Sequence, residues 1–387
     1  IRDVAGCLVG SEMCIRDRFL TLATVFPDGA TEDDLLRLYR PRPGLPFTPV
    51  VMADGSRRLA WTTFTAAQMD IDVTSQSGQD YLQAVLDRLA DAGAASVRLD
   101  AVGYAIKTAG TSSFMTPHTF AFIDQLTRMC RARALQVLVE VHSYFETQIQ
   151  IAGKVDLVYD FALPPLVLHA LIEGDPTPLT RWLHVRPRNC VTVLDTHAGI
   201  GVIDVGADAE DRARPGLLTP AQIDSLVESI HRNSAETSRA ATGAAASNVD
   251  LYQVNCTFYD ALGGSDEGYL VARAIQFFTP GIPQVYYVGL LAGSNDMDLL
   301  ARTNVGRDVN RHYYTPGEVE SELDRAVVLA LCIVIRLRYW HSALVGVFTA
   351  VGDVTTVALA WRYAGVTARL TIDFEARSAG LDWTVNG

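Results

Sequence analysis

The chain has 387 residues, of which 49% are hydrophobic, enough for one large domain with smaller appendages. Its net charge of −12 at pH 7 argues against nucleic acid or an anionic membrane as a partner. The longest apolar stretch, 326–335, is too short to cross a bilayer and runs into Arg336 and Arg338, so we interpret it as a buried helix.

The N-terminal part of the chain has little regular pattern. Residues 1–18 contain Ile-Arg-Asp twice and resemble a translated sequencing adapter, so we expect this segment to be non-native, the alternative being an ordinary irregular N-terminus. Native sequence is then expected to begin near Phe19, with the true N-terminus absent. Residues 19–74 include the proline-rich segment 39–46, which predicts an extended loop.

Apolar runs typical of buried strands alternate with amphipathic segments further along the chain. The runs predict strands at 97–100, 137–140, 155–161, 191–194 and 284–288. Helices are predicted at 79–92 and 117–133, and another begins at Pro220. The small residues of 234–247 predict a flexible stretch, and the alternation after about residue 344 predicts a small antiparallel sheet.

This order of elements predicts an α/β fold. Strand, helix and strand with an acid at each strand's carboxyl end is typical of a (β/α)8 TIM barrel. Because five such strands are visible where a complete barrel has eight, we expect a barrel that lacks about three N-terminal βα units. An open, doubly wound five-stranded sheet is the alternative, but its glycine fingerprint is absent.

The expected domain plan has loop-rich inserts and a small C-terminal β domain. It consists of the adapter-like segment 1–18, a loop-rich insert 19–74, barrel parts 75–199 and 265–343, a second insert 200–264 and the β domain 344–387.

Two acids follow the first two predicted strands, and they are the leading candidates for catalysis. Asp100 and Glu140 each stand where an apolar run ends. A carboxylate pair in that position suits glycosyl transfer, in which one acid attacks the anomeric carbon and the other protonates the leaving oxygen. Arg98 lies on the same strand face as Asp100 and can hold it ionised. Taken alone, either acid could instead meet solvent or cap a helix.

The cysteines show no metal-binding spacing. The four beyond residue 100, Cys130, Cys190, Cys256 and Cys332, lie in apolar runs, as the free thiols of cytosolic proteins do. We therefore expect no metal site and a cytoplasmic location.

Longer motifs surround these residues. The segments RLDAVGY (98–104), EVHSY (140–144) and LDTH (194–197) resemble conserved regions of glycoside hydrolase family 13. The segments 40–48, 159–165, 250–255 and 306–314 are similar to the sucrose phosphorylase branch of that family. The resemblance extends from about residue 19 to the C-terminus.

The resemblance implies a retaining double displacement that transfers glucose from sucrose to inorganic phosphate, giving α-D-glucose 1-phosphate and fructose. It makes Asp100 the nucleophile and Glu140 the general acid and base, and it places Arg42 and Arg307 at the phosphate. Arginine suits a phosphate dianion because its planar fork binds two oxygens. Phosphate is a substrate here, and no cofactor is implied.

The resemblance also implies a set of sugar-binding residues, which comprises Arg98, Tyr104, His142, His197, Phe64, Asp250, Tyr252 and Gln253. Each has a simpler alternative, such as a core phenylalanine, a structural histidine or a solvated surface arginine. The branch includes monomers and homodimers.

One position departs from the family pattern. After Leu-Asp-Thr-His the family has an aspartate that stabilises the oxocarbenium-like transition state, and this chain has Ala198. Asp195 belongs to the strand and is not expected to take over this role. Loss of such an electrostatic group typically costs several powers of ten in rate. We therefore expect weak or no activity from the chain as it stands.

Two hypotheses follow from this departure. The chain is either a phosphorylase of this branch with a change at position 198, or a non-catalytic homologue that at most binds sugar. Within the first, the alternative donors are sucrose 6′-phosphate, glucosylglycerol and glucosylglycerate. The loop 40–48 favours sucrose.

Overall fold

The structure is a computed structural model that describes residues 18–41, 44–52, 54–244 and 253–385. It divides into two compact units. Within the described residues, the first unit runs to Val141 and includes Gly153–Leu157, and the second contains the remainder from His142 onward.

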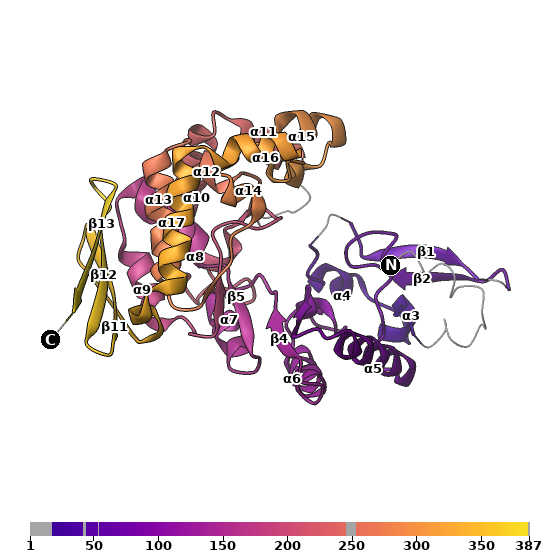
Figure 1. The fold of residues 1–387 in the computed structure, drawn as a ribbon. Coiled ribbons are helices and arrows are strands. Elements are labelled where there is room, and N and C mark those ends of the chain that lie inside the picture. The colour runs from indigo at the N-terminus through magenta and orange to yellow at the C-terminus, as the bar shows by residue number, and fades with distance from the viewer. Residues whose placement is uncertain (1–17, 42–43, 53, 245–252, 386–387) are drawn as a thin grey trace. The chain divides into compact units, whose positions relative to one another are not determined.

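The first unit begins with a hairpin and two short helices (Figure 1). Strands β1 (Phe47–Val51) and β2 (Arg57–Trp61) pair antiparallel, and helices α3 (Leu22–Val25) and α4 (Glu32–Arg37) precede them. Short regular elements are thus present in a segment whose sequence shows little regular pattern. Threonine capping boxes start both helices, and a small core of Leu20, Phe26, Leu38 and Trp61 holds the segment together.

A strand–helix–strand unit follows, as predicted. It comprises α5 (Gln76–Asp91), β3 (Ser96–Leu99), the 3-10 turn η1 (Val102–Tyr104), α6 (Pro117–Arg131) and β4 (Gln136–Val139). Ser75 and Thr116 accept hydrogen bonds from the first turns of α5 and α6, and Pro117 stands at the first helical position. Strands β3 and β4 are parallel, with Leu99 opposite Val139, so the residues that follow them lie at the same edge.

The second unit has a parallel set of its own. Strand β5 (Leu157–Asp160) pairs with β6 (Cys190–Thr192), which pairs with β9 (Ile282–Pro283). The strand predicted at 284–288 was placed wrongly, because the strand ends at Pro283 and Tyr287–Leu290 form helix α14. A short apolar run is compatible with either a buried strand or a buried helix, so the sequence pattern did not place this boundary.

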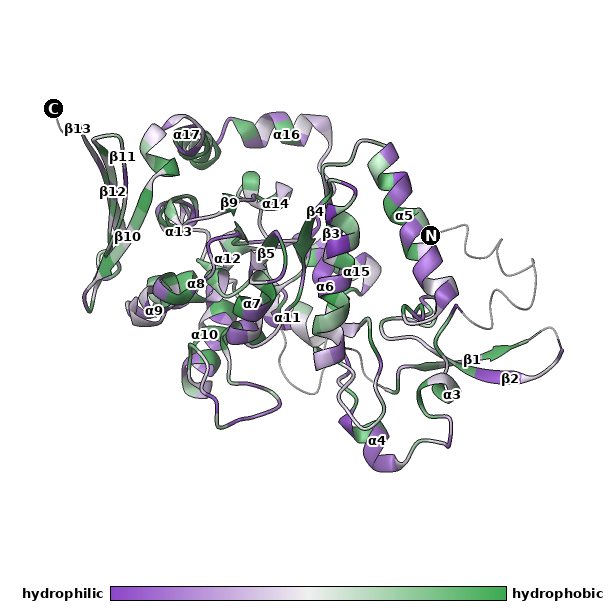
Figure 2. Cartoon of the chain, turned by 90° about the horizontal axis from the view of Figure 1, so that it is seen from below, coloured by the Kyte–Doolittle hydropathy of each residue, from purple (hydrophilic) through white to green (hydrophobic). Residues whose placement is uncertain are grey.

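Helices surround this second set. They are α7 (Phe145–Ala152), α8 (Leu163–Glu173), α9 (Thr177–Val185), α10 (Pro220–Asn233), α11 (Thr237–Ala244), α12 (Phe258–Ala261), α13 (Asp266–Phe278), α15 (Met297–Thr303), α16 (Pro316–Leu323) and α17 (Ala326–Trp340). The second unit also contains a short antiparallel pair, β7 (Ile200–Gly201) and β8 (Gln253–Val254). Its 3-10 turns are η2 (Ile203–Val205), η3 (Gly306–Asn310) and η4 (Ser342–Val345). Helix α8 is apolar almost throughout and is buried from Leu163 to Leu171, whereas α5 in the first unit alternates polar and apolar faces (Figure 2).

Two local predictions in this unit need correction. The stretch expected to be flexible contains α11, whose Ser238 is fully buried and bonded to His231 Nδ1 at 2.7 Å. The apolar run 326–335 does form a helix, but Leu329 and Ile333 are 54% and 66% exposed. Helix α17 is therefore buried along one side and not all round.

The small antiparallel sheet predicted at the C-terminus is present. It has the order β10 (Val347–Gly352), β11 (Thr356–Tyr363), β12 (Val366–Asp373) and β13 (Ser378–Val385). Trp361 of β11 donates its indole N–H to the carbonyl of Phe278 at 2.7 Å, which ties the sheet to the end of α13.

Candidate active site

Asp100 and Glu140 follow the paired strands β3 and β4, and Arg98 joins them. A guanidinium nitrogen of Arg98 lies 2.9 Å from Asp100 Oδ1, and the other terminal nitrogen donates to Glu140 Oε2. The side chain of Asp100 is 69% exposed, whereas that of Glu140 is 15% exposed. Two carboxylates thus share one cation at the ends of adjacent strands.

Aromatic rings lie close to this acid pair in the sequence and form a cluster. Tyr104, in η1, packs edge-on against Phe64 at 5.4 Å between ring centroids and against Phe114 at 4.6 Å. Phe114 in turn stacks on Tyr39 at 4.6 Å. The sequence analysis selected Tyr104 and Phe64, and the structure brings them into contact.

A buried lysine fixes the backbone of this cluster. The ammonium of Lys107 bonds Asp70 Oδ2 at 2.8 Å, Thr63 Oγ1 at 2.8 Å and the Tyr104 carbonyl at 2.5 Å. Burial lowers the pKa of Lys107, while the Asp70 carboxylate acts in the opposite direction. All three ammonium donors are used, so Lys107 anchors Tyr104 and the segment after β2 together.

In the second unit, His142 is held on two sides. Its Nδ1 lies 2.8 Å from Asp204 Oδ2, and its ring stacks on Phe161 with centroids 3.8 Å apart. Asp204 is fully buried, and its Oδ1 accepts hydrogen bonds from the Ser143 amide and Gln148 Nε2. Since an ionised carboxylate only accepts, it places the proton on Nδ1 and leaves Nε2 as the acceptor.

The sequence analysis selected His142 but missed Asp204 and Phe161. Asp204 is 62 residues away along the chain, in a segment assigned to an insert. No local spacing pairs these residues, so only the fold could show that Asp204 orients the imidazole.

A small pocket next to His142 contains position 198. Its lining includes His142, Phe161, Thr196, Ala198 and Asn310. Ala198 is 7% exposed, and its side chain offers the pocket only a methyl group. Asn310 is 2% exposed, and its Oδ1 has no hydrogen-bond partner within the described residues. The pocket therefore has a polar acceptor but no carboxylate at position 198.

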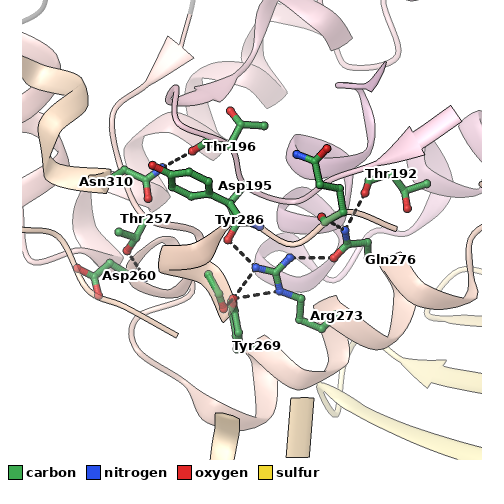
Figure 3. Close-up of polar contacts among 12 residues, drawn as sticks. Thr192, Asp195, Thr196, Thr257, Asp260, Tyr269, Arg273, Gln276, Tyr286 and Asn310 are labelled. Atoms are coloured by element: carbon green, nitrogen blue, oxygen red, sulfur yellow. Dashed lines mark hydrogen bonds and ion pairs between the residues drawn. The ribbon is translucent and has the colours of Figure 1, made fainter. Parts of the chain in front are cut away.

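Asp195 is committed elsewhere, in a buried network (Figure 3). Its Oδ2 lies 2.5 Å from Arg273 NH2, and Arg273 is fully buried. The same guanidinium contacts the Tyr269 hydroxyl and donates to Gln276 Oε1 at 2.8 Å. Gln276 donates in turn to the carbonyl of Thr192 at the end of β6. Asp195 therefore lines the pocket that contains Ala198 with its carboxylate paired to Arg273.

The remaining predicted residues are dispersed over several elements. His197 is exposed next to Ala198, Arg307 is half-buried in η3, and Gln253 lies in β8, where it donates to Asn255 Oδ1 at 3.2 Å. Arg42, Asp250 and Tyr252 lie outside the described residues.

The described residues show neither a metal-binding cluster nor a membrane-spanning helix. Over the described ranges, no cluster of three or more His, Cys, Asp or Glu side chains could hold a metal ion. In the same part of the chain, no helix is long and apolar enough to span a membrane.

Comparisons with known proteins identify the class of fold. No protein-family model matches the chain. An α-amylase from H. orenii superposes with a TM-score of 0.57 at 13% identity, covering 87% of this chain and 64% of that structure. The fold is that of the α-amylase-type barrels with a C-terminal β domain.

Similarity in sequence identifies the family. Sucrose phosphorylases from Agrobacterium vitis and Bifidobacterium adolescentis are 54% and 53% identical over 98% and 97% of this chain, and the matches span 78% and 74% of those proteins. A glucosylglycerol phosphorylase from Marinobacter adhaerens is 38% identical over 91% of this chain and 72% of its own length. The structure of sucrose 6F-phosphate phosphorylase from Thermoanaerobacter thermosaccharolyticum superposes with a TM-score of 0.87 at 34% identity, covering 97% of this chain and 76% of that one. The chain belongs to the sucrose phosphorylase family of glycoside hydrolase family 13.

Proposed function

We propose that the chain is built for the phosphorolysis of sucrose. The observation that carries the proposal is the acid pair Asp100 and Glu140, which Arg98 joins at the ends of adjacent parallel strands. More than half of the aligned residues are identical to those of sucrose phosphorylases, which supports sucrose as the donor. Glucosylglycerol is less well supported, because identity to a glucosylglycerol phosphorylase is 38%.

The first step forms a glucosyl ester. A carboxylate oxygen of Asp100 attacks the anomeric carbon as the glycosidic bond breaks, and Glu140 gives its proton to the departing fructose oxygen. Arg98 keeps Asp100 ionised before attack, and its contact with Glu140 favours the carboxylate that remains after proton transfer.

The second step transfers the glucosyl group to phosphate. A phosphate oxygen attacks the same carbon, Glu140 accepts its proton, and the ester bond to Asp100 breaks to release α-D-glucose 1-phosphate. Arg42 and Arg307 hold the phosphate in this proposal, because a planar guanidinium can bind two oxygens of a dianion.

Sugar hydroxyls are the expected partners of the remaining groups. His142 Nε2 faces them as an acceptor, because Asp204 holds the proton on Nδ1. The Tyr104 and Phe64 rings supply an apolar wall. The further sugar contacts proposed are His197, Gln253, Asp250 and Tyr252. Acid, nucleophile and phosphate complete the chemistry without a cofactor, and we propose a cytoplasmic location.

The second candidate function is sugar binding with little or no turnover. It rests on Ala198, which cannot stabilise positive charge on the sugar ring, and on Asp195, whose carboxylate is paired with Arg273. In this case the chain retains affinity for sucrose but not the rate.

The experiment measures phosphate-dependent release of glucose 1-phosphate from sucrose by the parent chain and by Ala198→Asp. We expect Ala198→Asp to raise kcat by about 10²-fold or more, since one preorganised charge at the transition state has that effect. Asp100→Asn and Glu140→Gln in the Ala198→Asp background are the inactive controls. No turnover by Ala198→Asp with any of the four donors, sucrose, sucrose 6′-phosphate, glucosylglycerol and glucosylglycerate, would overturn the proposal. Sucrose binding without turnover in both forms would establish the second candidate.

A further inference from the structure

Three consecutive backbone carbonyls next to the candidate site are bonded by one short segment. Asn310 Nδ2 donates to the Thr196 carbonyl at 2.7 Å and to the Ala198 carbonyl at 3.2 Å. Arg311 Nε donates to the intervening His197 carbonyl at 2.9 Å. Figure 3 shows the Asn310 side chain reaching Thr196. Residues 196–198 lie outside the strands of the described part of the chain, and these side chains bond carbonyls that a sheet would otherwise pair.

The donor segment is itself firmly held. Asn310 is 2% exposed at the end of η3, and the Val309 carbonyl accepts a hydrogen bond from the Asp296 amide at 2.8 Å. His312 Nδ1 lies 2.6 Å from Asp296 Oδ2. The backbone carbonyl of His312 accepts a hydrogen bond from the Tyr287 hydroxyl at 2.9 Å. The segment can therefore impose a position on the carbonyls that it bonds.

The bonded carbonyls determine where two side chains of the candidate site point. A carbonyl direction fixes the plane of the following peptide, so the three bonds define the backbone on both sides of His197 and Ala198. The Ala198 amide is fixed as well, because it donates to Thr196 Oγ1 at 3.1 Å. Arg307, the proposed phosphate ligand, lies three residues before Asn310 in the same turn.

We propose that Asn310 and Arg311 are positioning residues that hold the backbone of 196–198 in register with the turn that carries Arg307. Through these hydrogen bonds, the residue at position 198 keeps one orientation in the pocket. The same bonds link the turn that carries Arg307, and with it a bound phosphate, to the backbone at His197 and Ala198. The catalytic part of this inference rests on the proposed function, whereas the structural part does not.

The structural part is tested by amide hydrogen exchange of the parent chain and of Asn310→Ala. We expect exchange in peptides covering 196–199 to rise about 10-fold or more, because the carbonyl contacts that order this backbone are gone. Asn233→Ala is the matched control, since Asn233 also donates to a backbone carbonyl, that of Ala261 at 3.0 Å. It should leave exchange at 196–199 unchanged. Equal exchange in the parent and Asn310→Ala would overturn the proposal.

A second variant covers the case in which Asn310→Ala does not fold. The side chain of Arg311 is 29% exposed, so Arg311→Ala removes one carbonyl contact without leaving a closed cavity. It should raise the exchange of the same peptides about threefold or more, and Arg311→Lys should restore part of the protection. Exposed Arg302, on α15, provides the control Arg302→Ala, which should have no effect. Unchanged exchange at 196–199 in Arg311→Ala would overturn the proposal.

The catalytic part is tested by a double-mutant cycle. Asn310→Ala should lower kcat about 10-fold or more in the Ala198→Asp form, with a smaller change in the KM for sucrose. In the parent chain it should lower kcat by a smaller factor, because only the link to the Arg307 turn is lost and an alanine methyl has no charge to misplace. An equal loss in both backgrounds would assign Asn310 a general structural role and contradict the positioning role. Failure of the proposed function is separate, since it shows as no turnover by Ala198→Asp with an intact Asn310.

Discussion

The carboxylate of Asp195 lies 2.5 Å from the guanidinium of Arg273, and both side chains are almost completely buried. Arg273 stands on α13, 78 residues further along the chain, and its contact fixes the segment that follows β6. Asp195 also faces the Tyr286 amide at 3.4 Å, at the start of α14. This ion pair therefore lies at the pocket that contains Ala198. Because the Asp195 carboxylate is already paired, we expect that it does not compensate for the alanine.

Breaking this pair should be strongly destabilising. Arg273→Met leaves the Asp195 carboxylate buried without its cation, which costs about 3–5 kcal/mol of unfolding free energy in comparable buried pairs. Adding Asp195→Asn removes the stranded charge and should restore part of the loss. Urea unfolding of the parent, the single variant and the double variant measures both effects. A cost below about 1 kcal/mol for Arg273→Met would contradict the account.

Gly289 should be essential for the same packing. A Cβ atom added there would lie 1.6 Å from Asp195 Oδ2 and 2.2 Å from Arg273 NH2. Gly289→Ala must therefore displace the ion pair, and we expect a loss of about 1–3 kcal/mol or more in unfolding free energy. Gly317→Ala, in helix α16 with nothing within 4 Å of its added Cβ, is the matched control. It should be neutral or stabilising by up to about 1 kcal/mol.

Local sequence patterns predicted much of the framework. Apolar runs and helix-capping residues located β3, α6 and β4. Both signals can be read from residues that are close together in the sequence. The acids at the two strand ends followed from the same logic, since parallel strands bring their carboxyl ends to one edge. The family motifs added the candidate roles.

Contacts between distant segments could not be predicted in this way. Asp204 orients His142, and Asn310 bonds Ala198, across separations of 62 and 112 residues. Asp204 and Asn310 do not stand at a fixed sequence spacing from the residues that they bond, so no local motif marks them. Helix α14 was missed because a short apolar run is compatible with a buried strand or a buried helix, and periodicity does not distinguish the two.

Asp204 should control the tautomer of His142. Asp204→Asn keeps the shape and can still accept from Ser143 and Gln148, but its amide group donates toward Nδ1 and shifts the histidine proton to Nε2. In the Ala198→Asp form we expect kcat/KM to fall about 10-fold or more, since the acceptor facing the sugar is lost. Nitrogen NMR of the imidazole reports the tautomer directly. An unchanged tautomer with unchanged kcat/KM would contradict this role.

Asp296 should make stability fall at acid pH. Burial alone would raise the pKa of Asp296, but the hydrogen bond from the Leu299 amide and the contact with His312 outweigh it, so the pKa lies below its ordinary value of 3.8. A depressed carboxyl pKa stabilises the fold above the unfolded pKa of about 3.9, and this contribution is lost as pH falls through the folded pKa. Asp296→Asn should therefore be less stable than the parent at pH 5–7, and the difference should shrink below about pH 4. Denaturant unfolding at several pH values measures it, and a difference independent of pH would refute the assignment.

The four cysteines of the described residues should separate into two reactivity classes. Burial raises the pKa of the Cys190 and Cys256 thiols to about 12 and also raises that of Cys130, whereas Cys332 on α17 is only half-buried. Because the thiolate is the reacting form, a pKa raised from 9.0 to about 12 lowers the thiolate fraction on the order of 1000-fold at neutral pH. Iodoacetamide at pH 7.5 followed by peptide mapping should therefore modify Cys332 in the native protein and leave the other three intact. All four should react once guanidinium unfolds the chain, and modification of Cys190 or Cys256 at the rate of Cys332 would show that these thiols are not enclosed as the structure places them.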